Sequence, residues 1–528
     1  MKSLTTDDPK DEGTDWRTVG GDGIARWFLV AVVCGLVWRI VRFGLHFELT
    51  GDETGIMRSV MERGYAGLLH PLSYYNVSPP LFLWMTKVLD SISPNEWAVR
   101  LMPFLAGIGA MAMFGLICRE ALSGTARWVA WAFFCVAYVP IAESTRVKGY
   151  TIDLLAATVM LWLMLRWLHT YKARYLLWLA LCAPVFVWLS FTSVFITGAM
   201  GLAFTACLLK LRPVSKGTLD DSGGLGWRNI SAGLTVMALA GVSAAFLYVL
   251  NIRPGLQASM GNGLQDAWKR GFPPSQVWEI PMWLLTVHTG RGFAWPVGEN
   301  HYGSTLTCVL WLIGLIAFWR HGNRRVWILF FAPQVLSLAA AFLHKYPYLQ
   351  NPRICMFLGP GICLFAGCGA QYLIERVDSG KRRLWYCFAA CVLALCALAG
   401  MGRDIVLRHR EIRGPGIRST LIETSSLLGA DGQIVVLNDG KNSGVFTYYI
   451  QRIVRQKVWY DGQMPKGRAR GSRLALAVVA SKMAEADGAA LFREFEKRNG
   501  RPLKVEWTQT AHEVLLDSQD SISVWICE

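Results

Sequence analysis

About eleven stretches of roughly 20 mainly apolar residues constrain the fold of this chain, because a helix of that length crosses a lipid bilayer. Hydrophobic residues make up 53% of the 528 residues and charged residues only 17%, which is too apolar for a soluble protein of this length. The sequence therefore predicts a mainly α, polytopic bundle of transmembrane helices. The stretches lie at residues 27–46, 97–118, 128–142, 147–168, 175–190, 192–210, 229–250, 305–319, 326–343, 353–373 and 385–401.

The net charge of +16 follows from membrane topology and does not indicate nucleic acid as a partner. Lys and Arg gather in alternate polar segments, as the positive-inside rule requires when the first segment is cytoplasmic. Arg39 and Arg42 are exceptions, since they lie inside the first apolar stretch and must either snorkel or face the protein. The long, acidic N-terminal segment is unlike a cleaved signal peptide. We expect a multi-pass protein of the plasma (inner) membrane with a cytoplasmic N-terminus.

The chain divides into three blocks by composition. Residues 1–26 form a polar cytoplasmic tail, 27–401 a membrane domain with outside loops at 47–96 and 251–304, and 402–528 a small α/β domain. Eleven spans would place this last domain outside the cytoplasm, on the side of the first outside loop. Its expected elements are strands at 433–438, 474–481, 503–508 and 522–527 and a helix at 484–500.

The first candidate site is "GDETG", where Asp52 and Glu53 follow the first apolar stretch. The segment 54–65 that comes next has apolar residues at helical spacing, which predicts an amphipathic helix at the membrane surface. Asp52 either caps this helix, a frequent role of Asp, or belongs to an active site.

A second polar cluster lies in "ESTRVKGYTIDLL", at the junction of the third and fourth apolar stretches. Ionisable groups at such depth usually face a cavity and a substrate. Snorkelling explains the two basic residues equally well, but it explains Asp153, one turn into the stretch, less well. The candidate substrate-binding residues here are Glu143, Arg146, Lys148, Tyr150 and Asp153.

Two later outside segments add further candidates. Lys345 and Arg353 lie in "HKYPYLQNPRICMFLGP", where Arg353 can grip a phosphate through a bidentate fork or simply anchor the helix at the interface. The aromatic loop 251–304 holds His288, a weak candidate that is more often structural than catalytic. The glycines of "GPGICLFAGCGA" (359–370) lie in an apolar stretch and predict close helix packing instead of a nucleotide site.

Taken in order, these motifs resemble the GT-C superfamily of integral-membrane glycosyltransferases, and within it family 39, which includes the protein O-mannosyltransferases and lipid A aminoarabinose transferases. The similarity covers most of 27–373. It rests on "GDETG", "SPPLFLW", "EWAVRLMPFLAGIGA", "ESTRVKGYTIDLL" and "RICMFLGP". Ser78 stands where many relatives have a basic or aromatic residue, which leaves the donor specificity open.

The resemblance implies that the enzyme moves a sugar from a polyprenyl-phosphate donor, embedded in the lipid bilayer, to a protein, lipid or glycan acceptor on the outer face. Asp52 would be the general base, with Glu53 as a helper or hydrogen-bond acceptor, and Arg353, Lys345, Arg146 and Lys148 would stabilise the leaving phosphate. Direct displacement would invert the anomeric centre. No residue is assigned as a metal ligand and no cofactor is expected with certainty, although a carboxylate pair can also bind a divalent cation.

Two other classes stay open at this stage. A transporter or lipid flippase also has many spans and buried charges, but it predicts duplicated halves and broken helices near the bilayer midplane. The sequence shows no duplication, and its charges gather at the outer surface. A non-catalytic scaffold is the third alternative.

Overall fold

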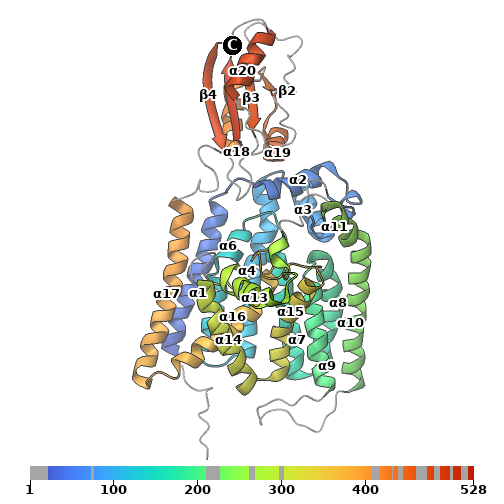
Figure 1. Cartoon of the computed structure of the whole chain (residues 1–528), viewed down its shortest axis with the longest axis vertical. Coiled ribbons are helices and arrows are strands. Elements are labelled where there is room, and N and C mark those ends of the chain that lie inside the picture. The colour runs from blue at the N-terminus through green and yellow to red at the C-terminus, as the bar shows by residue number, and fades with distance from the viewer. Residues whose placement is uncertain are drawn as a thin grey trace, which may run out of the picture.

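The computed structural model shows a bundle of long helices with a small sheet beyond one end of it (Figure 1). This architecture confirms the predicted fold class. The structure describes residues 22–72, 76–209, 226–260, 268–296, 303–406, 416–430, 432–437, 444–459, 473–480, 488–499, 504–512 and 521–527. Most of the polar tail, residues 1–21, lies outside this described part.

Eight helical segments among the described residues are long and apolar enough to cross a membrane, so the chain is an integral membrane protein. One of them is continuous through three elements, since α10 (Trp227–Leu247) runs through η2 (Tyr248–Ile252) into α11 (Arg253–Met260). The helices that make up the eight segments are α1 (Asp22–Gly44), α4 (Glu96–Ala121), α7 (Tyr150–Thr170), α10 (Trp227–Leu247) with its continuation, α14 (Gly303–His321), α15 (Arg324–Phe342), α16 (Gly359–Ile374) and α17 (Ser379–Val406).

The count of eleven spans is not confirmed. Two of the expected stretches form shorter apolar helices, α8 (Ala173–Leu189) and α9 (Ser193–Leu208). The stretch 128–142 is not one helix but two, α5 (Ala126–Cys135) and α6 (Tyr138–Glu143). The break has a local cause: Pro140 lies in the first turn of α6, and its ring nitrogen has no proton to donate to the carbonyl of Val136.

Arg39 and Arg42 face the protein. Nη1 of Arg39 donates to the backbone oxygen of Cys135 at 2.6 Å, which satisfies a carbonyl left open where α5 ends. Nη1 of Arg42 lies 2.7 Å from Oδ2 of Asp404, and the Trp38 indole donates to the same oxygen at 2.8 Å. These buried contacts fasten α1 to α5 and α17.

Close helix packing at the glycine-rich segment is confirmed. A Cβ atom on Gly369 of α16 would overlap the backbone oxygen of Leu310 on α14, and one on Gly314 of α14 would overlap that of Phe365. Small residues let the two backbones touch, which is how helices pack where the surrounding lipid offers no hydrophobic driving force.

Two short helices, α2 (Gly51–Glu62) and α3 (Pro80–Ile92), lie at the end of the bundle nearest the sheet (Figure 1). α2 begins at residue 51, three residues before the predicted amphipathic segment, and it buries the apolar face that the spacing predicted: Ile56, Met57 and Val60 are fully buried. Loop 251–304 also contains helices: α11, η3 (Lys269–Gly271), η4 (Val277–Glu279), α13 (Ile280–Val287) and η5 (His288–Gly292).

The C-terminal block contains a five-stranded sheet in the order β2-β1-β3-β5-β4. β1 (Gln433–Val436) runs parallel to β2 (Lys457–Trp459) and β3 (Leu474–Ala480), whereas β5 (Ser521–Cys527) is antiparallel to β3 and to β4 (Val505–His512). All four predicted strands are present, although residues 437 and 504, which were included in the predictions, lie just outside β1 and β4. The predicted helix at 484–500 is confirmed as α20 (Gly488–Asn499), while 484–487 lie outside the described residues.

Two further helices, α18 (Ile417–Leu428) and α19 (Gly444–Ile453), lie between the sheet and the bundle (Figure 1). One apolar cluster runs through this junction. It joins Ile56 and Phe82 of the first outside segment to Ile417, Tyr449 and Val436 of the C-terminal block. The C-terminal block is therefore packed onto α2 and α3.

Candidate active site

Asp52 is the second residue of α2 and lies near the positive end of that helix's dipole, which stabilises a negative charge. Its side chain is 52% exposed, and its Oδ2 lies 3.6 Å from Nη1 of Arg353. Within the described part of the chain, Asp52 does not cap the helix and has no other ion-pair partner. Its carboxylate is thus charged and accessible.

Glu53, the next residue, points into the protein and is 1% exposed. Its Oε2 accepts from the backbone nitrogen and hydroxyl of Thr50 at 2.9 and 3.0 Å, which forms a capping box at the start of α2. Its Oε1 accepts from the nitrogen of Val147 at 2.8 Å and from Nη2 of Arg100 at 3.2 Å. The carboxylate is saturated by protein donors, so Glu53 is the hydrogen-bond acceptor of the pair.

The turn between α6 and α7 brings a second set of charges to Asp52. Nζ of the buried Lys148 donates to Oδ1 of Asn76 at 3.0 Å, and Nη1 of Arg146 lies 3.2 Å from Oε1 of Glu143. The other oxygen of Glu143, Oε2, is buried with no hydrogen-bond partner among the described residues. The turn is held against α2 because Val147, between the two cations, donates to Glu53.

These cations set the electrostatics of the site. The Lys148 ammonium holds the pKa of Asp52 below its usual value, partial burial opposes this, and Arg353 and Arg146 lower the pKa further. Burial lowers the pKa of Lys148, an effect that Asp52 opposes. The site therefore combines an ionised, accessible carboxylate with three cationic side chains.

Tyr150 and Asp153 lie on the first turn of α7, directly after this cluster. Asp153 is buried, and the buried side chain of Ser190, where α8 ends, lies near it. The Ser190 hydroxyl is in turn 3.1 Å from that of Thr192. Asp153 thus lies on α7 close to the turn between α8 and α9.

The fold is similar to that of solved membrane proteins. A crystal structure of ArnT from Cupriavidus metallidurans bound to undecaprenyl phosphate matches with a TM-score of 0.55 and 12% identity, covering 94% of this chain and 98% of that one. The apo state of the same protein matches with a TM-score of 0.54, 11% identity and the same coverage. These matches decide the fold. The chain has the GT-C fold.

The apo oligosaccharyltransferase of Archaeoglobus fulgidus is more remote, with a TM-score of 0.45, 11% identity, and coverage of 82% of this chain and 64% of that one. A TM-score this low carries no weight for the function of this chain. No protein-family model and no curated protein matches the sequence. The predicted GT-C resemblance is therefore confirmed at the level of the fold.

On this GT-C frame, most of the predicted site residues come together around Asp52. Arg353 arrives from the segment before α16, and the others arrive from the turn between α6 and α7 and from the start of α7. The residues brought together are Asp52, Glu53, Glu143, Arg146, Lys148, Tyr150 and Arg353, and Asp153 lies beside Tyr150 at the edge of this group.

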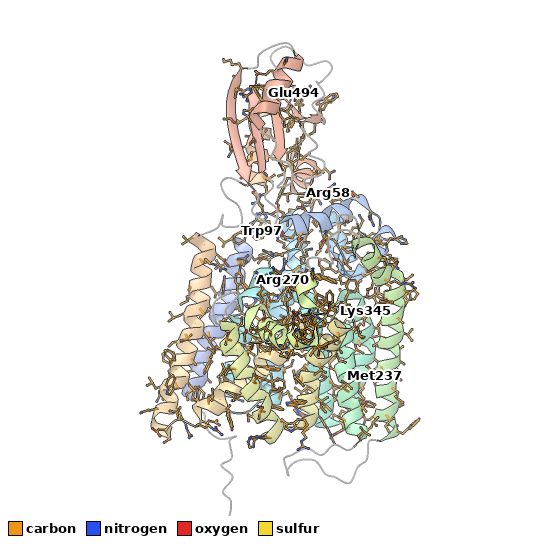
Figure 2. The ribbon with its side chains drawn as sticks, viewed as in Figure 1. Arg58, Trp97, Met237, Arg270, Lys345 and Glu494 are labelled. Carbon is orange, nitrogen blue, oxygen red and sulfur yellow. The ribbon has the colours of Figure 1, made fainter. Side chains whose placement is uncertain are left out.

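His288 and Lys345 are not brought into this cluster by any contact in the described part of the chain. Nδ1 of His288 bonds the backbone oxygen of Leu284 at 2.7 Å, and Nε2 bonds the hydroxyl of Tyr348 at 3.1 Å. Burial lowers the pKa of His288, so a neutral, structural imidazole fits this position. Lys345 is exposed, lies lower in the bundle than Arg58 of α2 (Figure 2), and has no side-chain partner among the described residues.

Four residues that support the site were not predicted from the sequence. Arg100 and Glu96 lie on the first two turns of α4, and Arg418 and Tyr449 come from the C-terminal helices. The sequence did contain a pattern from which Arg100 and Glu96 could have been predicted. In "EWAVR" a Glu and an Arg stand four residues apart, which puts them on the same face of a helix. Nothing in the sequence pointed to Arg418 or Tyr449.

The residues do not favour a cation shared by Asp52 and Glu53. Glu53 already accepts four hydrogen bonds on the two oxygens of its carboxylate, so the pair does not offer two open carboxylates to one ion. No cluster of three His, Cys, Asp or Glu side chains suited to a metal occurs among the residues that the structure describes. The divalent cation stays an untested expectation.

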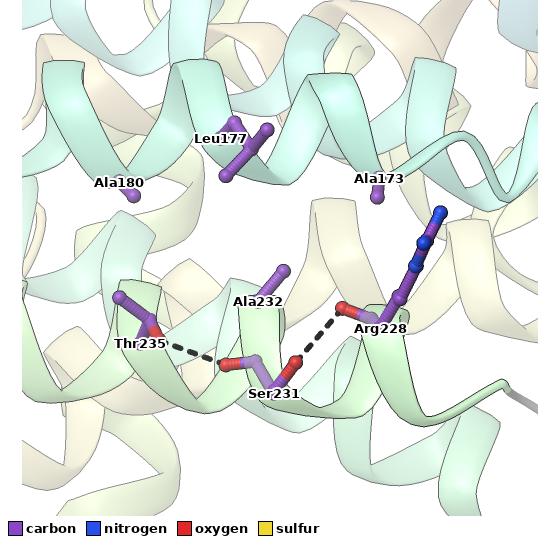
Figure 3. A pocket seen from close by; sticks show the side chains of 7 residues that line it. All are labelled: Ala173, Leu177, Ala180, Arg228, Ser231, Ala232 and Thr235. Atoms are coloured by element: carbon purple, nitrogen blue, oxygen red, sulfur yellow. Dashed lines mark hydrogen bonds between the residues drawn. The ribbon is translucent and has the colours of Figure 1, made fainter.

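A cleft of about 320 Å³ lies between α8 and α10 (Figure 3). Its hydroxyl groups bond to their own helix, since Ser231 donates to the oxygen of Arg228 at 3.2 Å and Thr235 to that of Ser231 at 2.9 Å. It lacks the convergent polar groups of a reaction site. Its lining residues are Ala173, Leu177, Ala180, Arg228, Ser231, Ala232 and Thr235.

Proposed function

We propose that this protein is a membrane glycosyltransferase that moves a sugar from a polyprenyl-phosphate donor to an acceptor on the outer face of the membrane. The observation that supports this most is the site itself. An accessible carboxylate, Asp52, lies 3.6 Å from Arg353, beside a turn that carries two further cations. The likeness of the fold to ArnT, whose crystal structure holds undecaprenyl phosphate, supports the choice of a lipid-phosphate donor.

In the proposed reaction an acceptor oxygen or nitrogen attacks the anomeric carbon from the face opposite the phosphate. The bond between that carbon and the phosphate oxygen breaks, and its electron pair leaves with polyprenyl phosphate. The acceptor's proton passes to Asp52. One displacement of this kind inverts the anomeric configuration.

The roles of the residues follow from charge. Polyprenyl phosphate gains negative charge as it leaves, so Arg353, Lys148 and Arg146 stabilise the transition state and no strong general acid is needed. Asp52 has a lowered pKa, so it is ionised and ready to accept a proton, although it is a weaker base than an unperturbed carboxylate. Glu143, Tyr150 and Asp153 would bind the sugar.

The proposal also includes the orientation of the chain. The N-terminus would be cytoplasmic, and the site and the C-terminal domain extracytoplasmic, as the distribution of Lys and Arg in the sequence favours. The residue ranges of the tail, membrane domain and C-terminal domain remain as predicted from the sequence.

The test is Asp52→Asn in the full-length protein in native membrane vesicles, which supply the acceptors, with added undecaprenyl phosphate carrying mannose, glucose or 4-amino-4-deoxyarabinose. We expect release of undecaprenyl phosphate to fall by about 10²- to 10⁴-fold, the usual contribution of a general base. Glu62→Gln is the matched control, because it removes a carboxylate from the other end of the same helix.

Full turnover by Asp52→Asn would refute the base assignment. Movement of intact donor lipid across the bilayer, with no sugar transferred by the wild-type protein, would instead favour the lipid flippase. The anomeric configuration of the product, determined by NMR, tests inversion separately.

A further inference from the structure

A buried series of alternating charges runs from the C-terminal domain to the start of α2. Its members come from three separate parts of the chain: Arg418 from α18, Glu96 and Arg100 from α4, and Glu53 from α2. Glu53, Glu96 and Arg100 are each less than 10% exposed. The series ends one residue from Asp52.

At the domain end, two side chains converge on Glu96. Nη1 of Arg418 lies 2.7 Å from Oε2 of Glu96, and the hydroxyl of Tyr449 donates to Oε1 at 2.8 Å. His46 adds a ring nitrogen at 3.2 Å from Oε2. Glu96 is therefore held by both helices that lie between the sheet and the bundle.

Arg100 links Glu96 to Glu53. Its guanidinium lies between the two carboxylates, 3.8 Å from Glu96 and 3.2 Å from Glu53. It also donates to the backbone oxygens of Phe47 and Glu48, in the segment that leads from α1 into α2. A planar group with fixed donors sets the position of all these acceptors together.

At the site end, Glu53 holds two backbone segments at once. It caps α2 through Thr50, which fixes the turn that carries Asp52, and it accepts from Val147, the residue before Lys148. Movement of Glu53 would therefore shift the base and the cation that sets its pKa relative to each other.

A second connection is shorter. The backbone nitrogen of Leu49, directly before the cap residue Thr50, donates to the hydroxyl of Tyr449 at 2.8 Å. In return Glu48 accepts from the nitrogens of Arg418 and Ser419 at 3.2 and 3.4 Å, at the start of α18. Segment 48–50 is thus hydrogen-bonded to the C-terminal domain through both its backbone and the side chain of Glu48.

We propose that Arg418 and Tyr449 are positioning residues for the transferase site, so that seating of the C-terminal domain sets the geometry of Asp52 and Lys148. This inference rests on the proposed function. Anchoring alone does not require such a network, because the domain has a separate ion pair, Arg452 with Asp90 on α3, that does not touch this series. A buried ion pair adds little net stability compared with apolar residues of the same size, although removing one partner is costly, and in some proteins such pairs serve to fix one arrangement.

The test compares Arg418→Ala with Arg452→Ala, which removes an ion pair at the same junction. We expect kcat to fall about 10- to 100-fold in Arg418→Ala, the range expected when reacting groups are displaced by about 1 Å, with KM for the donor nearly unchanged. Arg418→Lys keeps the charge and should recover part of the loss. Arg452→Ala should retain the wild-type kcat.

Hydrogen–deuterium exchange of the peptide spanning α2 provides a readout that simple anchoring would not move. Exchange should rise at the start of α2 in Arg418→Ala and stay at the wild-type level in Arg452→Ala. Tyr449→Phe is the second variant: it keeps the buried ring and removes only the hydroxyl, and it should also lower kcat and raise exchange in α2.

Equal effects of Arg418→Ala and Arg452→Ala on kcat and exchange would overturn the inference, as would wild-type kcat in both Arg418→Ala and Tyr449→Phe. Failure of the proposed function looks different. In that case the wild-type protein would transfer no sugar, while the exchange measurement would still report whether the C-terminal domain orders α2.

Discussion

The substitution Glu53→Gln separates the two acids of "GDETG". It keeps the size and shape of the side chain but replaces one acceptor oxygen with an amide that can only donate. Each oxygen of Glu53 receives two hydrogen bonds, on one side from Thr50 and on the other from Val147 and Arg100. Whichever way the amide turns, it faces at least one backbone N–H.

The magnitude follows from these contacts. Removing one partner of a buried ion pair costs about 3–5 kcal/mol. We take the lower end of this range because Arg100 would still be paired with Glu96 and would still donate to two backbone oxygens. Leaving a buried backbone N–H without an acceptor costs about 1–3 kcal/mol more. We expect Glu53→Gln to lower the free energy of unfolding by about 4–6 kcal/mol, which combines these two contributions.

The assay is unfolding by sodium dodecyl sulfate in mixed micelles, followed with a thiol-reactive fluorophore. Cys118, Cys135 and Cys363 are buried in the bundle, so they become reactive as it opens. Asp52→Asn is the comparison: its side chain is 52% exposed, and it should change the free energy of unfolding by less than about 0.5 kcal/mol. Wild-type stability in Glu53→Gln, together with a loss of turnover as deep as in Asp52→Asn, would refute this reasoning and make Glu53 catalytic.

Two further predictions concern charge and packing. Lys148→Met removes the largest cause of the lowered pKa of Asp52, so that pKa should rise and the acidic limb of the kcat/KM profile should move to higher pH; an unmoved limb would contradict the assigned electrostatics. Gly369→Ala inserts a methyl group against the backbone of α14 and should destabilise the bundle by about 1–3 kcal/mol in the same unfolding assay. Gly241→Ala, on α10 with open space around it, is the control and should be close to neutral.

Much of the fold could be predicted from the sequence because its main signals are local. Apolar length predicts spans, and alternating or continuous apolar runs predict strands, so residues 433–436 and 474–480 were found as β1 and β3. The stretch 128–142 was wrong as one span, since apolar length alone does not reveal a break ahead of Pro140. Apolar length also overlooked α18 and α19, which are short and amphipathic.

For the candidate site, the charged residues could be predicted from the sequence, but the residues that support them could not. The acids and cations around Asp52 could be found because ionisable residues at the ends of apolar stretches are conspicuous. The role of Arg100 could not be recognised, since a single charged residue near the end of a span is usually interpreted as an anchor at the membrane interface. The partners of Glu96 could not be found, because Arg418 and Tyr449 lie more than 300 residues away and only the fold brings them together.

The structure also shows which acid of "GDETG" caps α2, while the active-site role of Asp52 stays a proposal. "TGDE" fits the capping box, in which a Thr is followed three residues later by a Glu, so the capping role belongs to Glu53. Successive residues of a helix point about 100° apart, because 3.6 residues make one turn. When Glu53 turns inward to complete the cap, Asp52 must therefore project away from it, into the space that Arg353 and Lys148 reach. The capping box and the exposure of Asp52 are two consequences of the same helix turn.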